Sequence, residues 1–289
     1  MELFIQQILN GLVIGSTYAV VAIGFSLAFT VLRVINFAHP DIFMIGMFTG
    51  LMAGRWVSDN ILVVLLGGAL GSAAVGYGLE RVVIRTLRGR DVLMTLIGTL
   101  GVAIMLQNGA AAFMSPDPVP YPASLPIKLL SIDAISLSVR QLANFGICIL
   151  VLAAISYYVR GTKLGRATRA VAERADVAAA FGVDVNRVSQ VSIVLASLMA
   201  GIAAVSVGML YGSAWAFVGL LYGLKSFTCM LVAGNRYFEG VMVVALALGV
   251  IEALVTGYVS SSLKDAVAFL VLIGVLYFRP NGLFGSYAT

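Results

Sequence analysis

The sequence contains few charged residues and very few side chains that bind metals. Charged residues make up 11% of its 289 residues, His39 is the only histidine, and the two cysteines are Cys148 and Cys229. Soluble domains use about a quarter charged residues, so this composition excludes an ordinary soluble protein. One histidine excludes a multi-histidine metal site. Both cysteines lie inside apolar runs, which favours buried thiols over a disulfide or metal framework.

Several enzyme motifs are also missing. The sequence contains no GxxxxGK[ST] phosphate loop, no HExxH and no GxSxG. These motifs carry nucleotide binding, zinc-dependent hydrolysis and serine nucleophiles. We therefore predict no catalytic residue, no metal site and no cofactor, and an intramembrane enzyme is a poor fit.

Long apolar runs dominate what is present. Hydrophobic residues make up 61% of the chain, and 31 glycines are scattered among them. Runs of about 20 apolar residues cross a bilayer as helices. We predict an all-α, polytopic helical membrane protein with a single transmembrane domain, 1–289, and about nine crossings. Segments 40–54 and 214–234 are ambiguous, so eight to ten crossings fit. The predicted crossings are 11–32, 40–54, 60–79, 92–114, 140–159, 189–212, 214–234, 238–258 and 265–278.

Basic residues predict the orientation in the membrane. The stretches 81–90 and 160–187 hold ten of the 18 Lys and Arg residues. Two predicted spans separate them, so both stretches lie on one side, which the positive-inside rule identifies as the cytoplasm. This clustering at span ends argues against nucleic-acid binding. Residues 160–188 then form a cytoplasmic loop, and the proline-rich segment 115–139 forms a periplasmic loop. The N-terminus is expected outside and the C-terminus in the cytoplasm.

The cytoplasmic loop is predicted to contain a helix from about Arg166 to Phe181. Its middle is rich in alanine, and Gly182 follows as a helix stop. Two interpretations remain open. The small-residue face can dock into a groove on another protein, or the loop is simply solvated and orients the neighbouring spans by its charge.

Polar residues in and between the spans are candidates for a solute path. In the first span, hydroxyl residues lie among glycines and alanines, a pattern that also serves helix packing. Before the second helix, Asn36 and His39 can cap or bridge a break, and Pro40 suits a helix start. Thr95 and Thr99 share one helix face. The path candidates are Ser16, Thr17, Tyr18, Asn36, Thr95 and Thr99.

Two ionisable residues are predicted inside the membrane. Lys225 lies near the centre of one predicted crossing and Glu252 lies in the next. Charged groups at this depth are costly unless they are paired or hydrated, and they mark functional sites. Their opposite signs favour mutual pairing. The alternative is direct contact with solute, or a charge relay in an ion-coupled secondary transporter.

Several stretches together resemble one family. They are GLVIGSTYAVVAIGFSL, INFAHPDIFMIG, LERVVIRTLRGRD, GTKLGRATRAVAERADVAAAFGVDVNRV, GLKSFTCML and the terminal RPNGLFG. They are similar to the shorter permease subunit of branched-chain amino acid type ABC importers, and the resemblance covers nearly the whole chain.

The resemblance implies an ATP-driven importer of the inner membrane. A periplasmic solute-binding protein delivers amino acids, branched-chain or similarly hydrophobic. A second permease subunit, a related chain, completes the path, and two cytoplasmic ABC ATPase subunits drive it. Related permeases carry urea, short amides or aromatic acids, which are the alternative substrates. The resemblance assigns ATPase coupling to the 166–183 helix. The coupling candidates are Arg166, Arg169, Ala170, Glu173, Ala179 and Gly182.

Overall fold

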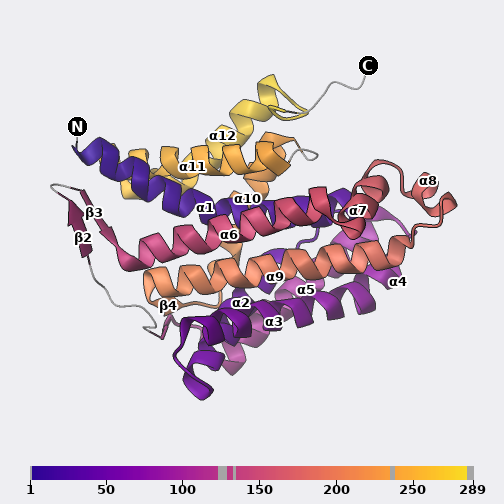
Figure 1. Ribbon diagram of the computed structural model, residues 1–289, viewed down its shortest axis with the longest axis horizontal. Coiled ribbons are helices and arrows are strands. Elements are labelled where there is room, and N and C mark those ends of the chain that lie inside the picture. Colours follow the sequence, from indigo (N-terminus) through magenta and orange to yellow (C-terminus); the bar gives the residue numbers. More distant parts are fainter. Residues whose placement is uncertain (1, 123–128, 133–134, 235–237, 285–289) are drawn as a thin grey trace.

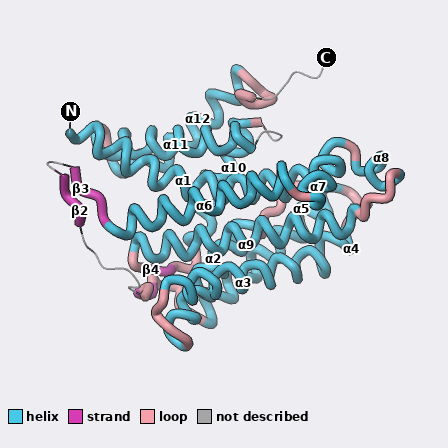
Figure 2. The backbone as a smooth tube through the Cα atoms, in the orientation of Figure 1, coloured by secondary structure: helices cyan, strands magenta, loops and turns pink. Residues whose placement is uncertain are grey.

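Helices make up almost all of the computed structural model, and most of them run along its longest axis (Figures 1 and 2). The structure describes residues 2–122, 129–132, 135–234 and 238–284. Asn235, Arg236 and Tyr237, part of a loop between two predicted spans, lie outside the described residues, as does Pro126 of the predicted periplasmic loop.

Seven helical stretches of the described residues are long and apolar enough to cross a membrane. Two shorter helices, α2 (His39–Trp56) and α10 (Val218–Ala233), correspond to the two remaining predicted crossings, 40–54 and 214–234. The prediction of a polytopic helical protein is confirmed, with some boundaries moved. The first span is longer than expected, because its helix begins at Glu2 instead of residue 11. The seven stretches are α1 (Glu2–Leu32), α3 to α4 (Ile61–Leu87), α5 (Val92–Phe113), α6 (Val139–Gly161), α9 (Val185–Tyr211), α11 (Phe238–Tyr258) and η2 to α12 (Ser261–Phe278).

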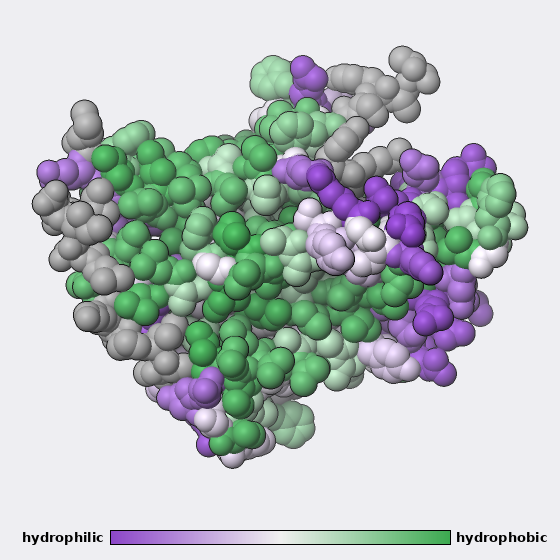
Figure 3. Space-filling view, in the orientation of Figure 1, coloured by the Kyte–Doolittle hydropathy of each residue, from purple (hydrophilic) through white to green (hydrophobic). Residues whose placement is uncertain are grey.

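The two ends of the bundle differ in structure and polarity. The hairpin of β2 (Leu129–Ile132) and β3 (Ile135–Ser138) lies at one end, called here the hairpin end, with β1 (Val119–Pro120) and β4 (Ser213–Ala214). The short helices α7 (Lys163–Glu173) and α8 (Ala175–Ala180) lie at the other, called the α7–α8 end. Figure 3 shows hydrophilic residues gathered at the α7–α8 end and an apolar surface over the middle. Helix α1 begins at the hairpin end, and α12 runs away from that end (Figure 1).

Helices α1 and α11 pack with their backbones in direct contact. A Cβ atom added at Gly11 would lie 2.5 Å from the Cα of Val250, and one at Gly249 would lie 2.4 Å from the Gly11 carbonyl oxygen. Only glycine permits this approach, which is a common way for helices to associate in lipid. The close contact fixes Tyr18 of α1 relative to Glu252 of α11.

The chain between α1 and α2 doubles back into the bundle. Arg33 ends α1 with a positive φ of 56°. Asn36 Oδ1 accepts a hydrogen bond of 3.1 Å from the Ala38 amide, so Asn36 bridges the turn before α2, while the N-cap residue Ala38 makes no side-chain cap hydrogen bond. The His39 ring packs edge-on against Phe25 at 4.4 Å between centroids. Helix α2 therefore begins beside the interior of α1, well away from its end.

Candidate functional site

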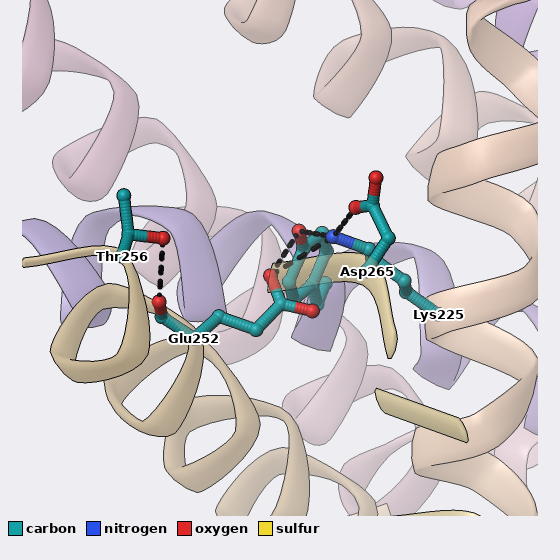
Figure 4. A network of polar contacts seen from close by, with 5 residues as sticks. Lys225, Glu252, Thr256 and Asp265 are labelled. Carbon is teal, nitrogen blue, oxygen red and sulfur yellow. Dashed lines mark hydrogen bonds and ion pairs between the residues drawn. The ribbon is translucent and has the colours of Figure 1, made fainter. Parts of the chain in front are cut away.

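Four polar side chains from four helices meet inside the bundle (Figure 4). The ammonium of Lys225 on α10 lies 3.0 Å from Glu252 Oε2 on α11 and 2.7 Å from Asp265 Oδ1 on α12. It also donates to the Tyr18 hydroxyl on α1 at 3.2 Å. That hydroxyl donates in turn to Glu252 Oε2 at 2.9 Å. We call Tyr18, Lys225, Glu252 and Asp265 the polar cluster.

The members of the polar cluster differ in exposure. The side chains of Lys225 and Glu252 are 6% and 5% exposed, whereas that of Asp265 is 43% exposed. An uncompensated charge in a low-dielectric interior is very costly, so each buried charge here depends on its partners. The Lys225 ammonium has three donor hydrogens and three oxygen partners, so its hydrogen-bonding capacity is used completely.

A cavity of about 520 Å³ opens beside the polar cluster. It lies between α1, α10, α11 and α12, with the start of α6 and the end of α9 at its rim. All of its lining belongs to the hairpin-end half of those helices. The polar lining beyond the cluster is Gln7, Asn10, Ser138, Gln141, Thr256 and Lys264.

The remaining wall of the cavity is apolar and aromatic. Tyr222 lines it while stacking on Phe43 at 5.3 Å and packing against Tyr18 at 5.6 Å between ring centroids. Binding pockets for small molecules combine apolar walls with a few placed polar groups. The apolar side chains of the lining are Val13, Ile14, Leu210, Leu221 and Ala253.

The six predicted path residues do not share one surface. Only Tyr18 lines the cavity. Ser16 donates to the Val13 carbonyl of its own helix at 2.7 Å. Thr17 accepts from Asn144 Nδ2 of α6 at 3.1 Å. Ser16 is therefore bonded within α1, whereas Thr17 joins α1 to α6, the packing use that the sequence left open.

The other path candidates lie at the α1–α2 connection. Thr99 Oγ1 accepts from the Phe37 amide at 3.3 Å, which ties α5 to this connection, and Asn36 accepts from the Ala38 amide within it. Thr95 is buried on the same face of α5. The six candidates therefore do not line one surface in this conformation, and their role in a solute path stays a prediction. Hydroxyl and amide groups at helix contacts satisfy backbone groups as readily as they line a path.

The single helix expected over residues 166–181 is two helices. α7 ends at Glu173 and α8 begins at Ala175, because Arg174 between them has an extended backbone with φ of −146° and ψ of 96°. Arg174 instead pairs with Asp176 at 2.8 Å. Hydrogen bonding to Arg174 lowers the pKa of Asp176 to about 2, so this carboxylate is charged at every physiological pH.

The inner face of α7 and α8 packs against the bundle through a small apolar cluster. Val171 of α7 and Ala178 of α8 lie against Val31 of α1 and Val188 of α9. The guanidinium of Arg33 donates to the carbonyl oxygens of Ala172 and Glu173. The end of α1 is therefore bonded directly to the end of α7.

The outer face of α7 and α8 has exposed apolar residues. Phe181 is 85% exposed and Val177 is 41% exposed. Gly182, with φ of 83°, turns the chain back toward α9. All six coupling candidates predicted from the sequence are exposed here: Arg166, Arg169, Ala170, Glu173, Ala179 and Gly182.

Sequence reasoning missed Asp265 and Arg33 as parts of these sites. Asp265 lies in the first turn of α12, where a carboxylate is ordinary because of the helix dipole. Arg33 looked like a charge that ends a span. Their proximity to Lys225 and to α7 depends on tertiary packing, and no spacing in the sequence indicates it.

The comparisons with known proteins cover nearly the entire chain. The family model described as branched-chain amino acid transport system / permease component matches residues 7–276. The high-affinity branched-chain amino acid transport system permease protein BraD of Pseudomonas aeruginosa is 34% identical, over 98% of this chain and 96% of that protein. The corresponding LivH of Escherichia coli K12 is 32% identical over the same shares.

Solved structures with a similar fold are more distant in sequence. PsaBC from Streptococcus pneumoniae in complex with Fab aligns with a TM-score of 0.51 at 14% identity, covering 96% of this chain and 91% of that one. An inward-facing conformation of a putative metal-chelate type ABC transporter gives 0.51 at 17% identity, with 95% and 87% covered. At these identities the likeness shows the fold alone.

Proposed function

This chain belongs to the family of permease components of branched-chain amino acid transport systems, and we propose that it forms half of the translocation path of an ATP-driven importer. A second, related permease subunit would form the other half. Two ATPase subunits would supply the energy, because this sequence has no phosphate loop of its own. A solute-binding protein would deliver the substrate.

The observation that carries this proposal is the α7–α8 segment. It is held to the bundle on one face, through Val171 and Ala178, and presents Phe181 and Val177 to solvent on the other. An exposed apolar group on a rigidly held element is the usual form of a protein docking site. In this proposal α7 and α8 contact the ATPases, and Arg33 transmits their movement to α1.

The same proposal sets the orientation. With α7 and α8 in the cytoplasm, the N-terminus lies outside and the C-terminus inside the inner membrane. The cavity beside the polar cluster then faces the binding protein. The proposed cargo is an amino acid with an apolar side chain, branched-chain or similar. Urea, short amides and aromatic acids are the alternatives within the same architecture.

Reconstitution tests the proposal. The chain is co-expressed with the permease, ATPase and binding-protein genes of its own system, purified and placed in liposomes. ATP-dependent uptake of labelled leucine, isoleucine or valine is expected, and uptake should stop without the binding protein. The proposal is refuted if the chain purifies without any ATPase, or if the rate of uptake does not depend on ATP.

One observation favours a second candidate. Lys225, Glu252 and Asp265 together resemble the charge relays of ion-coupled transporters. That function predicts uptake driven by a proton or sodium gradient in liposomes that contain this chain alone. The ATP dependence measured in the same preparation separates the two candidates.

A further inference from the structure

The cavity presents charges of both signs within one chain. Lys225 and Lys264 line it together with Glu252 and Asp265, so its charged lining is balanced. A site of this kind favours a ligand that is itself neutral overall and carries both charges. A simple anion or cation would leave a net charge in a poorly solvated space.

One acceptor for a ligand ammonium is open to the cavity. Glu252 Oε1 is buried and has no hydrogen-bond partner among the described residues, although Oε2 of the same carboxylate has two. Asp265 is 43% exposed and lies 2.7 Å from Lys225, at the boundary between the polar cluster and the open cavity. Because Glu252 Oε1 is fully buried and Lys225 already lies between the two carboxylates, the half-exposed carboxylate of Asp265 is the acceptor that a ligand ammonium can reach.

The lining also distinguishes the two ends of a ligand. Lys264, on the turn of α12 next to Asp265, offers a cation to a ligand carboxylate. The wall formed by Val13, Ile14 and Leu221 offers an apolar surface to a side chain. The volume of about 520 Å³ is within the range of small-molecule sites and exceeds the size of a single amino acid.

We propose that this cavity binds a free α-amino acid, with its ammonium at the half-exposed carboxylate of Asp265, its carboxylate toward Lys264, and its aliphatic side chain against Val13, Ile14 and Leu221. The inference rests on the proposed function and deepens it. It places a substrate site inside this single permease chain, in addition to any site on the delivering protein. Such a site would select zwitterions at the membrane stage of transport.

Cysteine protection tests the site in the intact assembly. Ala253 lines the cavity, and Tyr258 on the same helix is 57% exposed and is not among the lining residues, so Ala253→Cys and Tyr258→Cys form a matched pair. The native Cys148 and Cys229 are buried. The complex of permeases and ATPases, in nanodiscs and without binding protein, is labelled with a hydrophilic thiol reagent. The probes are isoleucine, isoleucinol, 2-hydroxy-3-methylpentanoate and sodium chloride.

Isoleucine should slow labelling of the cysteine at 253, by about tenfold at a concentration ten times its dissociation constant. It should leave labelling at 258 unchanged. Isoleucinol lacks the carboxylate and the hydroxy acid lacks the ammonium, so each should protect weakly. Asp265→Asn, at a half-exposed position, should reduce protection without disturbing assembly.

Three outcomes overturn the proposal. They are no protection by isoleucine, equal protection by the two analogues, and protection by sodium chloride alone, which would identify an ion site. Uptake by the reconstituted system keeps this failure separate from failure of the proposed function. ATP-driven amino acid uptake without protection removes only the cavity site, whereas absence of any amino acid uptake removes the proposed function as well.

Discussion

Lys225 and Glu252 form a buried ion pair of 3.0 Å between α10 and α11. The pair does not stand alone, because Asp265 shares the same ammonium at 2.7 Å. Because these three charged groups differ in exposure, removing each of them should change the stability of the protein by a different amount.

Lys225→Met should destabilise the protein more than Glu252→Gln. The first change leaves the Glu252 carboxylate buried without its ammonium, a loss of about 3–5 kcal/mol by analogy with broken buried pairs. The second change leaves Lys225 paired with Asp265. The double variant should recover part of the loss, and this coupling is measured in a double-mutant cycle of thermal unfolding in detergent.

Asp265→Asn is the control for that cycle. Its side chain is 43% exposed, so solvent screens the interaction and the loss should stay below about 1 kcal/mol. If Lys225→Met is no more harmful than Glu252→Gln, and the double variant shows no recovery, the pair does not contribute to stability as described.

Gly249→Ala should weaken the contact between α1 and α11. The added Cβ would lie 2.4 Å from a backbone oxygen, so the helices must separate, and overpacking of this kind costs about 1–3 kcal/mol. The unfolding temperature in detergent measures the loss. Gly274→Ala is the matched control, since its Cβ would meet nothing within 4 Å. A loss equal to that of the control would contradict the packing description.

Arg33→Gly should impair coupling while the protein still assembles. Glycine accepts the positive φ of 56° at this position but removes the guanidinium that binds the carbonyl oxygens of Ala172 and Glu173. We expect ATP hydrolysis to continue with fewer solutes moved per ATP. Arg81→Gly, which removes another basic residue from the cytoplasmic side in this orientation, serves as control. An unchanged ratio of uptake to hydrolysis in Arg33→Gly would remove Arg33 from the proposed pathway.

Gly182 should be sensitive to backbone conformation and indifferent to side-chain size. Its φ is 83°, and a Cβ there would meet nothing within 4 Å. Gly182→Val should therefore cost about 1–2 kcal/mol locally and displace Phe181. Gly182→Asn should be tolerated better, because asparagine adopts this region more readily. Coupled uptake distinguishes the two variants. Equal uptake in both would show that this turn does not position Phe181 for the ATPases.

The sequence predicted the architecture well because apolar length and charge clustering act locally. Runs of apolar residues gave the spans, and Pro40 and Asn36 indicated the start of α2. The opposite charges of Lys225 and Glu252 also predicted that these two residues pair with each other, since an isolated charge in either helix would be too costly. These inferences need only the chain's local chemistry and the properties of the bilayer.

Other features depend on tertiary packing and could not be predicted from the sequence. Thr17 was predicted to line a path because a hydroxyl in a span can do so or can serve helix packing, and its contact with Asn144 of α6 could not be read from the sequence. The alanine-rich stretch around Arg174 has high helix propensity, yet the chain breaks there. Tertiary contacts of Val171 and Ala178 with α1 and α9 outweigh that propensity.

The position of the cavity limits what this conformation can do. Its lining ends at Lys225, and the interior next to it toward α7 and α8 is filled by aromatic contacts such as Phe25 with Phe227, 6.1 Å apart between ring centroids. The cavity is therefore closed about halfway along the bundle to a molecule that enters from the hairpin end. Under the proposed function, passage of a solute would require α10 to be displaced from α1 and α2, and this conformation would be the one that receives solute.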